Sequence, residues 1–332
     1  MNIFIRAYGS HLMGMGHLYR VKKIIAKLRT IKSYNITLLT RKYDEAINIY
    51  STLDIDNIIE LDKDISIDEE IKYLTNYFKQ NKFDICINDQ LNTPIDIAKV
   101  LTKNIQKNIT FDDCGDGSGL FNNIINVLYP SNKNLPNEIN SYNYMILDDY
   151  SKIKENITFK ENVKKIFINQ GAADTWGAIP DMINDFNKVN SHVILKILLG
   201  PSFNHYDELS IALKNSNKQI EIYNFTDSVL DLVKDCDLAI LGAGNTLFEV
   251  ASLGIPIIAS TREEKELITI NRLLIDNIVF AENKLYKSGL ENIVNKVISD
   301  KKERKNKSNL SRKLFDYNGL NKICDLILGE KR

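Results

Sequence analysis

The 332-residue chain has little of the residue types that mark several protein classes. Six prolines and 15 glycines are too few for a collagen-like or low-complexity chain. The cysteines form no CxxC pair and no short spacing, which excludes the usual ligand patterns of zinc and iron–sulfur sites; they are Cys86, Cys114, Cys236 and Cys324. Isolated cysteines fit a reducing compartment, so we expect a cytoplasmic protein without a metal or other cofactor.

Long apolar runs and an excess of charge are also missing. No segment approaches 18 uninterrupted apolar residues, and the first apolar run is too short for a signal peptide, so we expect no integral membrane segment. Lys plus Arg and Asp plus Glu both number 43. Because phosphate contacts require excess positive charge, we expect no nucleic-acid partner. The basic block at residues 301–307 contains no aromatic residue and is interpreted as a solvated linker.

Short apolar runs alternate with longer segments of helical periodicity, which is typical of parallel sheets with crossover helices. The predicted strands of the first half are 2–6, 35–40, 58–61, 85–88, 108–111 and 124–128. After a polar stretch at 148–162, interpreted as a linker, strands are predicted at 165–169, 193–199, 219–223, 238–241 and 256–260. We expect two doubly wound, Rossmann-type α/β domains, residues 1–150 and 151–332, with a ligand in a cleft between them.

A glycine turn, Gly14-Met15-Gly16, separates the first predicted strand from a strongly periodic helix. Glycines allow a tight turn and the close approach of a ligand to the helix start, where free N–H groups favour an anion. His17 follows in the first helical turn, and imidazole is the side chain best suited to taking a proton near neutral pH. The pattern predicts a catalytic base beside a substrate site, although a helix-capping loop with an incidental histidine is the alternative.

A second glycine turn in the other half has the same form. Gly242 and Gly244 follow a predicted strand, and Asn245 or Thr246 is a suitable N-cap for the next helix. Its free N–H groups would suit a phosphate. Glu249, about one turn into that helix, could accept hydrogen bonds from ribose hydroxyls. Two such turns facing one cleft would suit a nucleotide diphosphate bonded to another group.

Two further turns are less specific. Gly171 follows the first strand of the second half and would allow close approach of a ligand, with Asp174 as the next helix cap, although an ordinary turn explains this segment equally well. Asp112 and Asp113 end a strand and could bind a substrate hydroxyl, although Asx turns are the favoured interpretation.

Taken together and in their order along the chain, these motifs resemble those of the GT-B superfamily and, within it, of the PseG/SpsG family of UDP-sugar hydrolases. Residues 14–20 resemble its G-x-G-H-x-x-R helix start, residues 110–113 its I-D-D segment, and Gly171 with Asp174 its G-G-x-D turn. Residues 242–256 resemble its nucleotide segment, and Asn271 falls at the asparagine of its N-Q pair. The chain departs from the family at Tyr8, Leu91 and Arg272, which lie in segments expected to line the sugar pocket.

The resemblance implies a nucleotide-sugar hydrolase. His17 would be the general base that activates water, which displaces UDP from the anomeric carbon and releases a free deoxyamino sugar. Gly242, Gly244, Asn245 and Thr246 would hold the diphosphate. Glu249 would hold the ribose, and Asn271 would contact the sugar or the diphosphate. The product would serve the biosynthesis of pseudaminic acid, of another nonulosonic acid or of a surface polysaccharide.

Three alternatives remain open at this point. An inverting GT-B glycosyltransferase resembling MurG would use the same nucleotide segment and differ only in accepting a hydroxyl group in place of water. A UDP-N-acetylglucosamine 2-epimerase and a nucleotide-sugar-binding protein without turnover are the others. No heptad repeat or apolar stripe indicates an oligomeric state.

Overall fold

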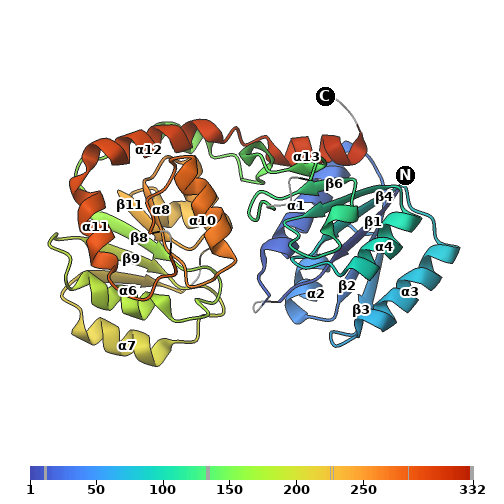
Figure 1. The fold of residues 1–332 in the computed structure, drawn as a ribbon, viewed down its shortest axis with the longest axis horizontal. Coiled ribbons are helices and arrows are strands. Elements are labelled where there is room, and N and C mark those ends of the chain that lie inside the picture. Colours follow the sequence, from blue (N-terminus) through green and yellow to red (C-terminus); the bar gives the residue numbers. More distant parts are fainter. Residues whose placement is uncertain (11–12, 132–134, 225, 227, 283, 330–332) are drawn as a thin grey trace. The chain divides into compact units, whose positions relative to one another are not determined.

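The computed structural model describes residues 1–10, 13–131, 135–224, 226, 228–282 and 284–329. The chain folds as two units, which are Met1–Ile146 together with the segment from Asn318, and Leu147–Tyr317. Each unit is built on its own parallel β-sheet (Figure 1). Among the described residues, no helix is both long and apolar enough to cross a bilayer.

The described residues of the first unit form a seven-stranded parallel sheet in the order β3-β2-β1-β4-β5-β6-β7. Its strands are β1 (Asn2–Ala7), β2 (Asn35–Arg41), β3 (Asn57–Leu61), β4 (Ile85–Asp89), β5 (Lys107–Phe111), β6 (Asn123–Ile125) and β7 (Glu138–Ile139). The connecting helices are α1 (Gly16–Ile31), α2 (Asp44–Tyr50), α3 (Ile67–Gln80) and α4 (Ile95–Asn104). Strand β4 is buried at every residue, as expected for a parallel sheet covered by helices on both faces.

Local sequence explains where these helices lie. Helix α3 begins at a capping box in which the Ser66 hydroxyl accepts from the Glu69 N–H and the Glu69 carboxylate accepts from the Ser66 N–H. Its apolar residues, with those of α4, then cover one face of the sheet, where Phe78 and Leu101 belong to the same buried cluster as Phe4. The hydrophobic periodicity of the sequence therefore decides both the helices and the face that each buries.

In the described part of the second unit, five parallel strands lie in the order β10-β9-β8-β11-β12. The strands are β8 (Lys165–Asn169), β9 (Ile194–Leu198), β10 (Gln219–Tyr223), β11 (Leu238–Leu241) and β12 (Ile257–Ala259). The helices are α5 (Ser151–Asn156), α6 (Ala178–Phe186), α7 (Tyr206–Asn215), α8 (Val229–Val233), α9 (Asn245–Ser252), α10 (Glu266–Ile275), α11 (Leu290–Ser299) and α12 (Lys301–Leu314). Residues of α6, α7 and α11 share a core with alternate residues of β8, β9 and β11.

Each sheet has a point where the strand order reverses. In the first unit the chain runs outward through β1, β2 and β3 and then returns to the other side of β1 as β4. In the second unit it runs through β8, β9 and β10 and returns beside β8 as β11. Ligands of open α/β sheets bind outside the carboxyl ends of the strands at such switch points. The segments after β1 and β4, and after β8 and β11, are therefore where binding sites are expected.

The prediction of two doubly wound parallel sheets is confirmed, and each predicted strand corresponds to one in the structure. The sequence analysis missed α2 and β7 and assigned α5 to a linker. These elements have seven, two and six residues, too short for a periodic pattern to stand out.

The final helix, α13 (Gly319–Leu328), lies with the first unit, although the sequence analysis predicted residues 151–332 as one domain. Figure 1 shows α13, in red, beside α1. The buried side chains of α13 include Ile323, Cys324 and Ile327. A Cβ atom on Gly319 would lie 2.1 Å from the Met145 backbone oxygen, so the absence of a side chain there allows close packing.

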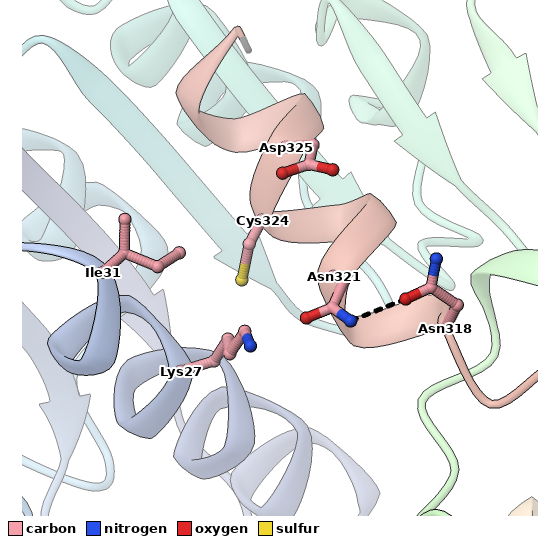
Figure 2. A pocket seen from close by; sticks show the side chains of 6 residues that line it. All are labelled: Lys27, Ile31, Asn318, Asn321, Cys324 and Asp325. Atoms are coloured by element: carbon pink, nitrogen blue, oxygen red, sulfur yellow. Dashed lines mark hydrogen bonds between the residues drawn. The ribbon is translucent and has the colours of Figure 1, made fainter. Parts of the chain in front are cut away.

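A pocket of about 360 Å³ lies between α1 and α13 (Figure 2). Lys27 and Ile31 line it from α1, and Asn321 with Asp325 from α13. The Asn321 side-chain amide donates to the Asn318 side-chain oxygen at 2.6 Å.

The basic block at 301–307 is not a solvated linker, because it forms the first half of α12. Asp300 caps this helix by accepting from the Glu303 N–H. Arg304 is fully buried and donates to the Val297 backbone oxygen at 2.7 Å, and Lys307 is also buried. The aliphatic parts of long basic side chains can pack in a protein core while their charged ends reach carbonyl groups, which composition alone does not reveal.

Candidate functional site

The switch point of the first unit brings together a histidine and a carboxylate. His17 is the second residue of α1, and Asp89 is the last residue of β4. The His17 Nδ1 atom lies 2.6 Å from Asp89 Oδ1. The Asp89 side chain is fully buried, whereas the His17 side chain is 14% exposed. With Nδ1 bound to the carboxylate, Nε2 has no hydrogen-bond partner among the described residues, which is the arrangement of a general base oriented by an acid.

Arg20, one turn later on α1, completes the charge arrangement. The Arg20 Nε donates to Asp89 Oδ2 at 2.7 Å, and Nη2 donates to Asp89 Oδ1 at 2.8 Å. The remaining nitrogen, Nη1, pairs with Asp112. Burial alone would raise the pKa of Asp89, but the Arg20 charge and the hydrogen bonds from Arg20 and His17 lower it to about 2. Asp89 is therefore ionised at neutral pH and can stabilise a protonated His17.

Tyr50 of α2 is a third member of this neighbourhood. Its side chain is 1% exposed, and its hydroxyl group has no hydrogen-bond partner among the described residues. Burial and the negative charge of Asp89 raise the pKa of Tyr50 well above its ordinary value. The hydroxyl group therefore stays protonated and can donate a hydrogen bond near the carboxylate.

The neighbouring aspartates have structural partners. Asp113 Oδ1 accepts from the Gly115 N–H at 2.9 Å, two residues on, which is the Asx turn that the sequence favours. Asp112 has a positive φ of 44° and accepts from the Leu128 N–H at 2.8 Å as well as from Arg20. Asp112 therefore contributes to the charge balance around Arg20.

The segment between β1 and α1 contains the other predicted residues of this turn. Gly14 has a φ of +96°, a backbone conformation that residues with a side chain rarely adopt. Gly16 is the first residue of α1. No side chain caps α1 among the described residues, so its first N–H groups are available to a ligand. At one departure from the family pattern, Tyr8 is buried and its hydroxyl accepts from Arg6 at 3.0 Å.

In the second unit, the glycine turn after β11 leads directly into α9. Gly244 occupies the N-cap position, not Asn245 or Thr246 as the sequence predicted, and no side chain caps the helix among the described residues. Asn245 and Thr246 are instead the first two residues of α9. Beside Gly242, the Ala243 N–H donates to Glu266 Oε2 at 2.9 Å, which shows that a carboxylate oxygen is readily accommodated at this turn.

Two polar atoms of the second unit are buried without a hydrogen-bond partner among the described residues, Asn271 Oδ1 on α10 and Gln170 Nε2 after β8. The Gln170 side-chain oxygen lies 3.7 Å from where a Cβ atom on Gly242 would be. Leaving such atoms unpaired is costly, so they indicate a polar ligand. Glu249 is half-buried in the middle of α9. The burial of Tyr150 and the negative charge of Glu249 raise the pKa of Tyr150.

The segment after β8 behaves as a structured turn. Gly171 has a φ of +77° and its N–H donates to Asn169 Oδ1 at 3.2 Å. Asp174 caps α6, because its two carboxylate oxygens accept from the N–H groups of Ala178 and Ile179 at 2.7 and 2.9 Å. Gly177 occupies the N-cap position of α6, but the Asp174 side chain satisfies the first N–H groups of the helix, which is the capping role that the sequence predicted. This role explains the aspartate without a ligand.

The structure thus divides the predicted residues between two switch points. Gly14, Gly16 and His17 lie in the first unit; Gly171, Gly242, Gly244, Asn245, Thr246, Glu249 and Asn271 lie in the second. The sequence analysis assigned no role to Asp89 or Tyr50, and it included Arg20 only as the arginine of the G-x-G-H-x-x-R helix start. A carboxylate at the end of β4 and an arginine three residues after His17 were the available signals. In the described part of the chain, no cluster of three or more His, Cys, Asp or Glu side chains is placed to hold a metal ion.

Comparison with known proteins agrees with this architecture. Residues 169–323 match the model of the glycosyltransferase family 28 C-terminal domain. The chain is 23% identical over 284 residues to the spore coat polysaccharide biosynthesis protein SpsG of Bacillus subtilis, covering 81% of this chain and 80% of that protein. It is 28% identical over 280 residues to an uncharacterised protein of Methanocaldococcus jannaschii, covering 80% of this chain but only 56% of that protein.

Solved structures share the fold over nearly the whole chain. The MurG structure from Acinetobacter baumannii aligns with a TM-score of 0.73 at 12% identity, covering 99% of both chains. The UDP-GlcNAc 2-epimerase of Neisseria meningitidis, described as bound to UDP-GlcNAc, aligns with a TM-score of 0.60 at 12% identity, covering 99% of this chain and all of that one. At such identities these likenesses show the fold, which is GT-B.

Proposed function

We propose that this chain, an SpsG-like member of the GT-B superfamily, is a nucleotide-sugar hydrolase that releases UDP and a free sugar for surface polysaccharide biosynthesis. The contact between His17 and Asp89 is the observation that carries the proposal. A histidine oriented by a buried, ionised carboxylate is suited to taking a proton from an attacking oxygen. The matches to SpsG and to a glycosyltransferase domain favour a sugar nucleotide as the substrate.

In the proposed reaction, His17 Nε2 takes a proton from water as the water oxygen attacks the anomeric carbon of the sugar. The bond between that carbon and the diphosphate oxygen breaks, and its electron pair leaves with UDP. Asp89 stabilises the positive charge that forms on the imidazole ring, in the way that the acid of a catalytic triad acts on its histidine.

The leaving group would be held in the second unit. At the uncapped N-terminus of α9, the N–H groups of Gly244, Asn245 and Thr246 would bind the diphosphate. Gly242 would contribute close approach of the ligand only, because its N–H donates to the Asn169 backbone oxygen at 3.3 Å. Glu249 would accept hydrogen bonds from the ribose, and Asn271 would use its unpartnered oxygen to bind a hydroxyl or amide group of the substrate. The proposal requires that a nucleotide sugar bound in the second unit reach His17 of the first.

A glycosyltransferase is the second candidate, because the matching domain model and the MurG-like fold are both associated with sugar transfer. The same histidine would then take the proton from a hydroxyl group of an acceptor. The two reactions differ in the nucleophile alone, so an assay without acceptor distinguishes them.

The test is nucleotide release from a panel of UDP-, CMP- and GDP-sugars without acceptor. We expect UDP and a free sugar from the wild type, with His17→Ala reducing turnover by roughly 10²- to 10⁴-fold while UDP affinity is kept. His192→Ala is the matched control, because His192 lies exposed before β9. Equal turnover of wild type and His17→Ala would remove His17 from the mechanism. Tight UDP binding without release would favour the transferase or a binding protein without turnover.

A further inference from the structure

Trp176, the only tryptophan of the chain, is an exposed aromatic side chain at the switch point of the second unit. It lies between β8 and α6, and 59% of its surface is exposed. Tryptophan is highly buried on average, so an exposed one at the carboxyl edge of a sheet requires an explanation. We propose that the indole face of Trp176 binds the sugar ring of the nucleotide sugar and contributes to sugar specificity. The inference rests on the proposed function.

The indole ring is exposed, but its polar edge is restrained by a hydrogen bond. Its N–H donates to Glu263 Oε1 at 3.0 Å, so the polar edge of the ring has its partner. The Trp176 backbone oxygen accepts from Arg262 at 2.6 Å. The Arg262 guanidinium also pairs with Asp181 of α6 and lies over the Tyr286 ring, 5.0 Å from its centre. A fixed side chain loses little conformational entropy when a ligand packs on it.

These contacts cross the end of β11. Trp176 follows β8, whereas Arg262 and Glu263 follow β12, and β11 lies between β8 and β12 in the sheet. A bridge between those two segments therefore spans the carboxyl end of β11, where the turn at Gly242 begins. The Glu266 carboxylate, bound to the Ala243 N–H, connects the same segment to that turn, since the Glu266 N–H donates to the Glu263 backbone oxygen at 3.1 Å.

The position of the bridge indicates which part of the substrate meets the indole. If the diphosphate lies on the turn at Gly242 and the ribose is held by Glu249 on α9, the group on the other side of the diphosphate is the sugar. The face of an aromatic ring carries partial negative charge and attracts the C–H bonds of a sugar ring. A ring with axial hydroxyl groups on that face would pack less well, so the contact would distinguish between sugars.

A single tryptophan makes the test direct, because all indole emission comes from Trp176. The wild type is titrated with UDP and with UDP-N-acetylglucosamine while Trp emission and its quenching by acrylamide are followed, and calorimetry measures binding independently. We expect UDP-N-acetylglucosamine to shift the emission to shorter wavelength and to reduce quenching, beyond the effect of UDP.

Two variants extend the test. Trp176→Ala is expected to weaken UDP-N-acetylglucosamine binding by roughly tenfold and to leave UDP binding unchanged, whereas Trp176→Phe keeps most of the affinity. Tyr206→Ala is the matched control, since Tyr206 is a similarly exposed aromatic residue of the second unit, at the start of α7. Its binding of both ligands should equal that of the wild type.

The outcomes separate the inference from the proposed function. If both ligands bind by calorimetry but change Trp emission and quenching equally, the indole does not contact the sugar and the inference is wrong, while the proposed function stands. A full response to UDP alone would assign the indole to the base or the ribose and would also overturn it. If neither ligand binds by calorimetry, the result contradicts the proposed function, and the inference fails with it.

Discussion

Replacing Asp89 with asparagine tests whether a buried carboxylate orients His17. Asp89→Asn keeps the size of the side chain but removes its negative charge, which pairs with Arg20 and contacts His17 Nδ1 at 2.6 Å. The oxygen of the asparagine amide can still accept a hydrogen bond from His17 Nδ1. If the amide rotates, its nitrogen takes that position, and the nitrogen cannot accept a hydrogen bond. The variant therefore loses both the fixed orientation of the imidazole ring and the charge that stabilises its protonated form.

The size of the effect follows from the pKa of Asp89. Its value of about 2, against an ordinary 3.8, means that the surroundings favour the ionised form by roughly 2 to 3 kcal/mol. Because the folded-state pKa is lowered, this contribution to stability is present above about pH 4 and is lost as the pH falls towards 2. We expect Asp89→Asn to lower the free energy of unfolding by roughly 2 to 4 kcal/mol at pH 7, with a smaller difference near pH 2.

Turnover should fall further than stability alone explains. By analogy with the acid of a catalytic triad, we expect the rate of UDP release to fall by roughly 10²- to 10⁴-fold. The assay is UDP release at 25 °C, with circular dichroism and thermal denaturation to establish that the variant is folded. UDP affinity should be unchanged, because the residues proposed to hold UDP belong to the second unit.

Asp112→Asn is the matched control for charge. Asp112 pairs with Arg20 but has no contact with His17 among the described residues. The Asp112→Asn variant should therefore be less stable than the wild type, but its turnover should stay within about tenfold of the wild-type value. A folded Asp89→Asn variant with wild-type turnover would refute the orienting role. Equal losses in both variants would assign the effect to the Arg20 charge network instead.

Two further predictions concern the second unit. Glu249→Ala should weaken UDP binding by roughly tenfold, as expected for losing hydrogen bonds to a charged group, and unchanged affinity by calorimetry would remove Glu249 from the ribose site. Gly200→Ala should lower the free energy of unfolding by roughly 2 to 4 kcal/mol in chemical denaturation, because its Cβ atom would lie 2.1 Å from the Ala172 backbone oxygen. Gly119→Ala is the control, since its nearest contact would be an ordinary 3.7 Å, and an equal loss there would refute the packing argument.

The sheets and the positions of the glycine turns could be predicted because they depend on local patterns. Apolar runs bounded by polar residues mark the strands of a parallel sheet, and glycines with positive φ, such as Gly14 and Gly171, stand where the chain must turn sharply. The Asp174 cap could be predicted for the same reason, since its partners lie within five residues. His17 was identified because its residue type and its place at a helix start are both readable in the sequence.

What the sequence by itself determined is therefore the set of elements, their parallel order and the residue types at their ends. Tertiary structure decided which of those ends meet. Asp89 lies 72 residues from His17 and becomes its partner because β4 pairs with β1 at the switch point. Trp176 and Glu263, 87 residues apart, are brought together across β11, and α13 joins the first unit by burying Ile323 and Ile327. Such contacts depend on how strands and helices pack at long range, and neither periodicity nor spacing within one segment contains that information.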